Sequence, residues 1–175
     1  MLSADIKLYA IKLGSILSPM ARSKQPKSNS WLALDHQLCF ALYSASLAMT
    51  KLYKPLLAPL KLAYPQYLVM LVLWEGDGVT VSQVGERLAL DSGTLTPLLK
   101  RLESAKLIQR LRDAADERRV LLQLTAAGRA LRARAESVPL RVARASGCEL
   151  GELSGLTARL RALRQQLSDS IPRVA

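Results

Sequence analysis

The sequence between residues 80 and 124 predicts two short helices followed by two short strands. Residues 80–88 have the pattern of a short helix, and residues 90–93 form a tight turn rich in small and helix-capping residues. A second helix follows, in which leucines recur at positions i, i+3, i+4 and i+7: Leu95, Leu98, Leu99 and Leu102. Two short helices joined by such a turn form a helix-turn-helix.

Two predicted strands come directly after the helix pair. Apolar and polar residues alternate over residues 107–112 and, less regularly, over residues 120–124. The segment between them, residues 113–119, is highly charged and suits the tip of a hairpin. A helix-turn-helix followed by a two-stranded hairpin is a winged helix, and the wing arginines are placed to reach a neighbouring minor groove of DNA.

The exposed face of the second helix carries hydroxyls near its N-terminal end and cations further along. These residues are Ser92, Thr94, Thr96, Lys100 and Arg101. The order suits a helix whose leading end reads base edges while its length meets phosphates. A helix pair with a glycine turn also occurs in many protein cores, so the pair alone does not distinguish a structural role from DNA binding. The charged wing favours DNA binding.

The composition agrees with a polyanionic partner and excludes several other classes of protein. The 175 residues include 25 Lys and Arg against 14 Asp and Glu, although most of the +11 excess lies near the two ends of the chain. One histidine and two cysteines are too few for a four-ligand zinc site or a disulfide framework, so we expect no metal and no cofactor. No apolar stretch approaches the ~20 residues that span a bilayer, and Lys7 and Lys12 interrupt any secretory signal. We expect a soluble, cytoplasmic protein without membrane contact.

Long helical segments flank the predicted winged helix. Asp35 is a good N-cap for an apolar segment that ends near Pro55 and is apolar on more than one face, which suggests a dimer interface as well as a core. Thr125 caps a second helical segment, bent at Pro139, and residues 149–167 form a last amphipathic helix. The leucine stripe of this last helix has no partner in the short winged core, so we expect it to complete a helical dimerisation layer.

These elements predict a mainly α fold of the α+β kind, a winged helix-turn-helix with an N- and C-terminal helical dimerisation layer. The DNA-binding domain spans residues 61–125 and includes a short buried helix over residues 67–74. The dimerisation layer comprises residues 34–60 and 126–172, and residues 1–33 form a weakly ordered extension to which we assign no function.

Cys39 lies early in the first of the flanking helices. A lone helical cysteine is usually a small buried hydrophobe. Here, however, the first turn of a helix favours a thiolate anion, and Tyr43, one turn later, is within reach to donate a hydrogen bond to the sulfur. Three further tyrosines are nearby in the sequence: Tyr53, Tyr64 and Tyr67. The residues alone leave both a reactive and a structural Cys39 open.

A cysteine peroxidase is the enzymatic interpretation of the same residue. Such enzymes usually place Thr or Ser three residues before the nucleophile and an arginine against the thiolate. Here position 36 is a histidine, and residues 31–50 contain no arginine. We therefore expect stoichiometric peroxide sensing and no enzymatic activity.

Residues 34–43, with the sequence LDHQLCFALY, strongly resemble the N-terminal signature of the organic hydroperoxide resistance regulators, a branch of the MarR family. The resemblance covers about residues 32–170 and continues through four further motifs. These are LDSGTLTPLLKRLE at residues 90–103, RLR at 110–112, DERR at 116–119 and LTAAG at 124–128.

The resemblance implies a homodimeric repressor that leaves its operator when organic hydroperoxides oxidise Cys39 to a sulfenic acid. It implies that Tyr53 and Tyr64 hydrogen-bond the reactive thiol, and that Asp116 holds Arg118 for insertion into the minor groove. The expected partners are a double-stranded DNA operator with an inverted repeat, a second copy of the chain, and an organic hydroperoxide as inducer. The expected DNA-binding residues are Ser92, Thr94, Thr96, Pro97, Lys100, Arg101, Arg110, Arg112, Asp116, Arg118 and Arg119.

The second cysteine departs from the family pattern. Arg144 occupies the usual place of that cysteine, and Cys148 lies four residues later. An intersubunit Cys39–Cys148 disulfide and capture of the sulfenic acid by a small external thiol both remain open, because a disulfide requires Cα atoms within about 7 Å. A MarR-type repressor released by a small phenolic ligand, with a structural Cys39, is the alternative to the peroxide sensor.

Overall fold

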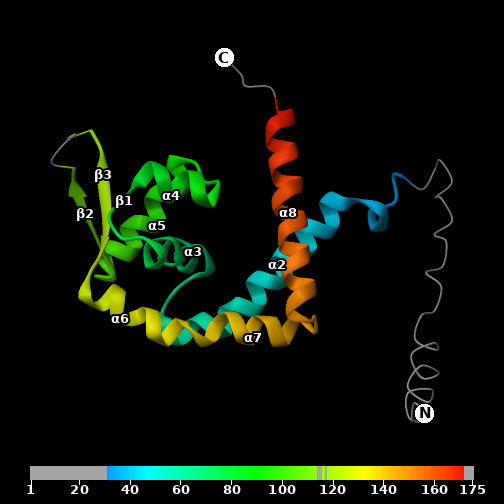
Figure 1. Cartoon of the computed structure of the whole chain (residues 1–175), viewed down its shortest axis with the longest axis horizontal. Helices are drawn as coiled ribbons and strands as arrows, with labels where there is room; N and C mark the ends of the chain where they lie inside the picture. The colour runs from blue at the N-terminus through cyan, green and yellow to red at the C-terminus, as the bar shows by residue number, and fades with distance from the viewer. Residues whose placement is uncertain (1–30, 114–115, 117, 172–175) are drawn as a thin grey trace, which may run out of the picture. The chain divides into compact units, whose positions relative to one another are not determined.

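The computed structural model describes residues 31–113, 116 and 118–171 (Figure 1). The chain divides into two compact units, one up to Ser44 and one from Ala45 onward. Most of the predicted N-terminal extension lies outside the described residues, as does part of the hairpin tip between residues 113 and 119.

The first unit contains a 3₁₀ helix, η2 (Leu34–His36), and the beginning of helix α2 (Leu38–Leu57). The prediction that Asp35 caps the long helix is wrong. Asp35 lies inside η2, and Gln37 interrupts the helix with an extended backbone while donating its N–H to the Leu34 carbonyl. The Gln37 side chain also donates to the carbonyls of Trp31 and Ala33, which fixes this break.

Helix α2 also ends later than the sequence predicts, because it continues through Pro55 to Leu57. A proline inside a helix removes one backbone hydrogen bond and usually ends the helix. Here the two residues after Pro55, Leu56 and Leu57, are buried in the core of the second unit. Their burial compensates for the lost bond.

The predicted helix-turn-helix is confirmed as helices α4 (Val81–Leu88) and α5 (Ser92–Ser104), preceded by the buried helix α3 (Tyr64–Glu75). Thr80 caps α4: its hydroxyl accepts from the Gln83 N–H at 3.2 Å, and its own N–H donates to the Gln83 side chain at 2.8 Å.

Three strands form an antiparallel sheet in the order β1–β3–β2. Strands β2 (Ile108–Arg112) and β3 (Val120–Leu124) are the predicted hairpin, with Arg110 opposite Leu122. Strand β1 (Val79–Thr80) was not predicted, because two residues are too few to show an alternating pattern.

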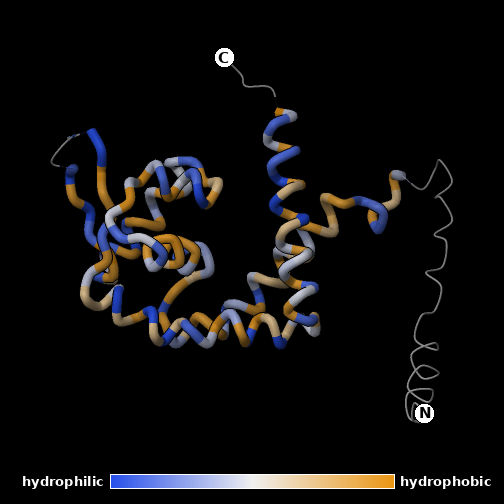
Figure 2. Tube along the Cα trace, in the orientation of Figure 1, coloured by the Kyte–Doolittle hydropathy of each residue, from blue (hydrophilic) through white to orange (hydrophobic). Residues whose placement is uncertain are grey.

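One hydrophobic core joins these elements, and the hydrophobic colouring along α3 in Figure 2 marks its centre. Its most buried large side chains are Leu57, Tyr67, Val69, Met70, Leu73, Val84, Leu95, Leu99, Leu102, Ile108 and Leu122. Three of the four predicted α5 leucines are therefore in the core, and the fourth, Leu98, is half-buried.

The C-terminal segment forms three helices: α6 (Ala126–Ala135), α7 (Ser137–Ser146) and α8 (Leu150–Ser170). The predicted cap is confirmed, since the Thr125 hydroxyl accepts from the Gly128 N–H at 3.0 Å. The predicted bend at Pro139 is misplaced, because the break falls at Glu136. Pro139 then occupies the first turn of α7, where a missing N–H costs little.

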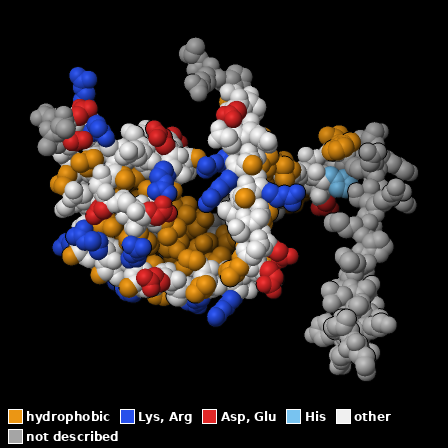
Figure 3. All heavy atoms as spheres, in the orientation of Figure 1, with side chains coloured by type: hydrophobic (Ala, Val, Ile, Leu, Met, Phe, Trp, Pro, Cys, Tyr) orange, Lys and Arg blue, Asp and Glu red, His pale blue; other side chains and the backbone are white. Residues whose placement is uncertain are grey.

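Large hydrophobic side chains remain exposed on α2, α7 and α8, and those of α8 are visible in Figure 3. They are Leu38, Tyr43, Leu47, Met49, Leu140, Leu150, Leu156, Leu160 and Leu167. No single described helix is long and apolar enough to cross a membrane, and one bent pair, Leu38–Leu60 with Tyr64–Glu75, meets the criteria of length and composition alone.

Candidate nucleic-acid interface and thiol site

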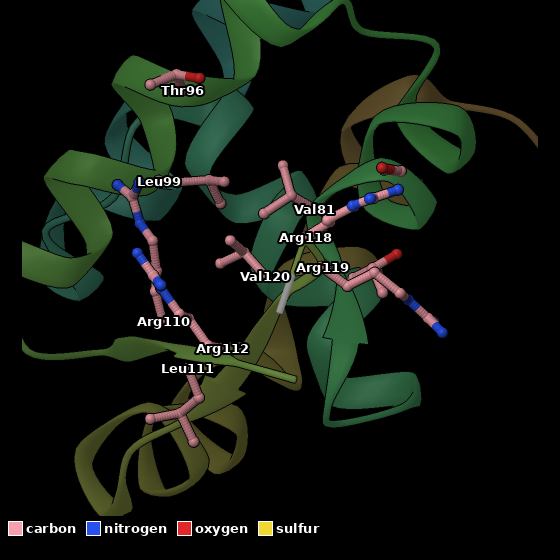
Figure 4. A pocket seen from close by; sticks show the side chains of 11 residues that line it. Val81, Thr96, Leu99, Arg110, Leu111, Arg112, Arg118, Arg119 and Val120 are labelled. Carbon is pink, nitrogen blue, oxygen red and sulfur yellow. The ribbon is translucent and has the colours of Figure 1, made fainter. Parts of the chain in front are cut away.

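A cleft of about 580 Å³ lies between helix α5 and the β2–β3 hairpin (Figure 4). Thr96 and Leu99 line it from α5, and Thr80, Val81 and Ser82 line it from the start of α4. The hairpin contributes Arg110, Leu111, Arg112, Arg118, Arg119 and Val120. Four arginines therefore line one cleft and make it strongly cationic.

Arg110 differs from the other three arginines because it is turned toward the protein. Its side chain is only 26% exposed, and its Nε lies 3.2 Å from the Glu103 carboxylate on α5. Nε and one terminal nitrogen, Nη2, are buried without a hydrogen bond. The ion pair joins the hairpin to α5, and sequence reasoning missed Glu103 because its partner is on another element.

The N-terminal half of α5 is held by Asp91. Its carboxylate accepts from the Thr94 N–H at 2.8 Å and from the Thr94 hydroxyl at 2.9 Å, and these bonds lower the pKa of Asp91 below its ordinary value. The Thr96 hydroxyl donates to the Ser92 carbonyl at 2.7 Å. Both threonine hydroxyls therefore use their protons inside the protein, which leaves them as acceptors toward a ligand.

The other predicted residues of α5, namely Ser92, Pro97, Lys100 and Arg101, are exposed along the helix. They share its solvent-facing side with Thr94, as the 3.6-residue period predicts.

The hairpin tip is closed by Asp116. Its carboxylate accepts from the backbone N–H of Arg118 at 3.1 Å, and its carbonyl accepts from the Arg119 N–H at 2.9 Å. Arg119 also approaches Asp113 at 3.7 Å. The acid thus holds the backbone of Arg118, whose side chain is exposed.

Cys39 is the second residue of α2 and is exposed. Tyr43 is 61% exposed. Within residues 31–44, neither the Cys39 sulfur nor the Tyr43 hydroxyl has a hydrogen-bond partner, so a single chain does not form the contact considered for this pair.

Tyr53, Tyr64 and Tyr67 form a cluster. The rings of Tyr53 and Tyr64 lie 4.5 Å apart between centroids, and those of Tyr53 and Tyr67 lie 5.8 Å apart. Burial, followed by the neighbouring Tyr64 and Tyr67, raises the pKa of Tyr53 to about 12. Burial also raises the pKa of Tyr64 and of Tyr67. All three hydroxyls therefore keep their protons well above neutral pH and remain hydrogen-bond donors.

The cluster predicts a pH dependence of stability. A raised pKa in the folded state contributes stability that is present below the unfolded tyrosine value of about 10 and is lost as pH rises through about 12. An absorbance titration of the folded protein should show phenolate formation that extends toward pH 12. In urea, the same tyrosines should ionise near pH 10. Tyr53→Phe should remove the part of the folded titration that occurs at the highest pH. Identical titrations of the folded and unfolded protein would contradict this environment.

Comparisons with known proteins agree with the winged fold. Residues 51–134 match the family described as transcriptional regulator SarA/Rot. The solved structure of reduced AbfR bound to DNA has a TM-score of 0.68 and 32% identity, and the match covers 83% of this chain and 100% of that chain; AbfR is a protein of Staphylococcus epidermidis.

A sequence relative settles the family. The organic hydroperoxide resistance transcriptional regulator of Bacillus subtilis (strain 168) is 49% identical over 139 residues, which cover 77% of this chain and 95% of the relative. The chain belongs to the organic hydroperoxide resistance branch of the MarR family. This MarR-family regulator is also 49% identical to the transcriptional regulator TtmR of Methylorubrum extorquens (strain PA1), over 77% of the chain and 69% of the relative. It is a transcriptional regulator with the predicted winged-helix fold.

The second cysteine of the regulator, Cys148, lies in the turn between α7 and α8. It is exposed, and its thiol donates to the Ser146 carbonyl at 3.5 Å. Both cysteines are free thiols. Within the described ranges, no group of three or more His, Cys, Asp or Glu side chains is arranged to hold a metal ion.

Proposed function

We propose that this regulator is a thiol-based repressor that binds an inverted-repeat operator as a homodimer and is released when an organic hydroperoxide oxidises Cys39. The observation that carries the proposal is the exposed Cys39 thiol in the first turn of α2, without a hydrogen-bond partner of its own in residues 31–44. A relative at 49% identity is named for organic hydroperoxide resistance.

The exposed apolar side chains of α2, α7 and α8 support the homodimer. Large hydrophobic residues spread along three helices are stable in water when another surface covers them, and a second copy of the chain provides a matching surface. The proposal assigns residues 34–60 and 126–172 to the helical dimerisation layer, and the exposed side chains of α2, α7 and α8 support this assignment.

The tyrosine cluster can supply the hydrogen-bond donors that the family resemblance assigns to the thiol. The rings of Tyr53 and Tyr64 lie 4.5 Å apart between centroids, so the two side chains can act together. The proposal is that they hydrogen-bond the Cys39 thiol of the partner chain.

The proposed sensing step is a nucleophilic displacement. The Cys39 sulfur attacks one peroxide oxygen, an S–O bond forms as the O–O bond breaks, and the alcohol leaves with the thiol proton. The resulting sulfenic acid then condenses with a second thiol, forming a disulfide and water. AbfR has been solved bound to DNA both reduced and overoxidised, and also with a disulfide formed. By analogy, we favour the disulfide as the form that releases DNA, with Cys148 as the second thiol.

On the DNA side, we propose that Lys100, Arg101, Arg112 and Arg118 contact phosphates and the minor groove. Arg110, which pairs with Glu103 of α5, lines the same cleft and would add its positive charge to the phosphate-binding surface. The hydroxyls of Thr94 and Thr96 would accept from base donors, since their protons are already used. Ser92 and Pro97 lie beside them, and Asp116 with Arg119 shapes the wing.

Arg118→Ala should weaken operator binding by about tenfold, because an exposed cation is lost. For the same reason, the slope of log affinity against log salt concentration should become smaller in magnitude by about one. Arg119→Ala should have a smaller effect, since Asp113 already approaches that guanidinium. Fluorescence anisotropy at several salt concentrations measures both quantities. An Arg118→Ala variant with the wild-type affinity and salt slope would show that the wing does not bind DNA.

A cavity of about 170 Å³ supports a second candidate function. Tyr67, Trp74 and Arg132 line it together with the carboxylates Glu75 and Glu136, between α3 and the α6–α7 segment. Aromatic rings beside a cation suit a small phenolic acid, which would make the protein a ligand-released repressor with a structural Cys39. Gel shifts with a salicylate-like compound and with a hydroperoxide separate the two functions.

A further inference from the structure

Asp77 joins three elements of the second unit from the loop after α3. Its Oδ1 accepts from the N–H of Leu124, at the end of β3, at 2.8 Å and from the N–H of Gly78 at 3.0 Å. Its Oδ2 accepts from the Arg129 guanidinium of α6 at 3.2 Å. The same Arg129 nitrogen donates to the Leu124 carbonyl at 2.6 Å. Loop, strand and helix thus meet at one carboxylate.

The first turn of α6 is also held from its other side. The indole N–H of Trp74 donates to the Gly128 carbonyl at 2.9 Å in a buried position. The Thr125 hydroxyl donates to the Lys106 carbonyl at 2.6 Å, in the turn between α5 and β2. The N-terminal end of α6 therefore has contacts with α3, with the sheet and with the turn after α5.

From these contacts we propose that Asp77 is a positioning residue. It fixes α6 to the loop after α3 and to the end of β3, so that α6 and the winged helix move together as one rigid body. The inference rests on the proposed function and adds to it that oxidation of Cys39 moves the helical layer and that α6 carries this movement to the DNA-binding elements. An ion pair as exposed as Asp77–Arg129, with side chains 39% and 59% exposed, adds little to stability. Its effect is on geometry.

Two variants remove the link from opposite sides. Asp77→Asn keeps an acceptor for Leu124 but loses the charge that holds Arg129, and Arg129→Met removes the guanidinium. Glu75→Gln is the matched control, because Glu75 lies two residues before Asp77 and forms its ion pair with Arg87 of α4 instead of with Arg129.

The direct test is a distance measurement between spin labels on α6 and β2. Labels at the exposed positions Ala130 and Gln109, in a background with both cysteines replaced by serine, report how variable the separation between helix and sheet is. We expect a narrow distance distribution in the unsubstituted background and in Glu75→Gln, and a broader one in Asp77→Asn and Arg129→Met. Unchanged distributions in both variants would overturn the inference.

A second measurement tests how the two substitutions affect release of the operator, in protein that keeps both cysteines. Operator affinity is compared before and after hydroperoxide treatment. When reduced, Asp77→Asn and Arg129→Met should bind operator with an affinity within about threefold of wild type. The factor by which oxidation lowers their affinity should be roughly five- to tenfold smaller than the factor for wild type. Release equal to wild type in both variants would overturn the coupling role. Wild-type protein that stays on DNA once Cys39 is oxidised would instead contradict the proposed function, and the label distances still decide whether Asp77 fixes α6.

Discussion

The Cys39→Ser variant is expected to bind operator as tightly as wild type and to stay bound after hydroperoxide treatment. Serine preserves the size and polarity of the exposed side chain at the start of α2, but its hydroxyl is not oxidised by peroxides. Wild-type protein should lose at least about 100-fold in affinity under the same treatment, the range of a strong allosteric coupling.

Fluorescence anisotropy with a labelled operator measures this difference, and Cys148→Ser is the companion variant. Loss of release in Cys148→Ser would indicate that the disulfide is required, whereas release in the presence of a small thiol would assign the second step to that thiol. If Cys39→Ser still left the operator on peroxide treatment, the sensor would have to be another residue.

Gly128→Ala is expected to reduce the free energy of unfolding by at least about 3 kcal/mol. A Cβ at this position would lie 2.0 Å from the Leu107 carbonyl oxygen and 3.2 Å from the Leu124 side chain. The oxygen belongs to backbone that also accepts from the Thr125 N–H at 3.0 Å, so it cannot move away without breaking this bond. The first turn of α6 would have to separate from the sheet.

Urea denaturation followed by circular dichroism tests this prediction. Gly151→Ala, in helix α8, is the control: nothing lies within 4 Å of its added methyl, and alanine should raise stability by up to about 1 kcal/mol. A Gly128→Ala variant with the wild-type midpoint would mean that α6 is not packed against Leu107 as described.

Local patterns were sufficient to predict the winged helix-turn-helix. The leucine spacing of α5 defines a face that must be buried, and Leu95, Leu99 and Leu102 are buried there. The alternation in residues 107–112 and 120–124 likewise predicts strands that pair in register. Thr125 is recognisable as a cap because its hydroxyl acts on residues of its own turn.

Features that depend on contacts between distant residues were not predictable in this way. The Arg110–Glu103 pair, the Asp77 contacts with Leu124 and Arg129, and strand β1 all join segments that no periodicity connects. The break at Glu136 escaped prediction because proline marks a nearby helix start as readily as a bend. Local hydrogen bonds of Gln37 moved the start of α2 away from Asp35.

The thiol site could be predicted only in part from local patterns. The motif around Cys39 singles out the cysteine, and Tyr53 and Tyr64 form a cluster in the second unit. No periodicity connects these tyrosines to the thiol, so their predicted role depends on the family resemblance alone.

Titration of operator-bound wild-type protein with cumene hydroperoxide, followed in parallel by anisotropy and by intact and peptide mass under non-reducing conditions, tests the central proposal most directly. We predict that DNA is released as about one equivalent of peroxide per chain is consumed, with a mass change that maps to the Cys39 peptide. Operator that remains bound after this peptide is fully oxidised, or release that precedes any change in its mass, would contradict a Cys39 switch.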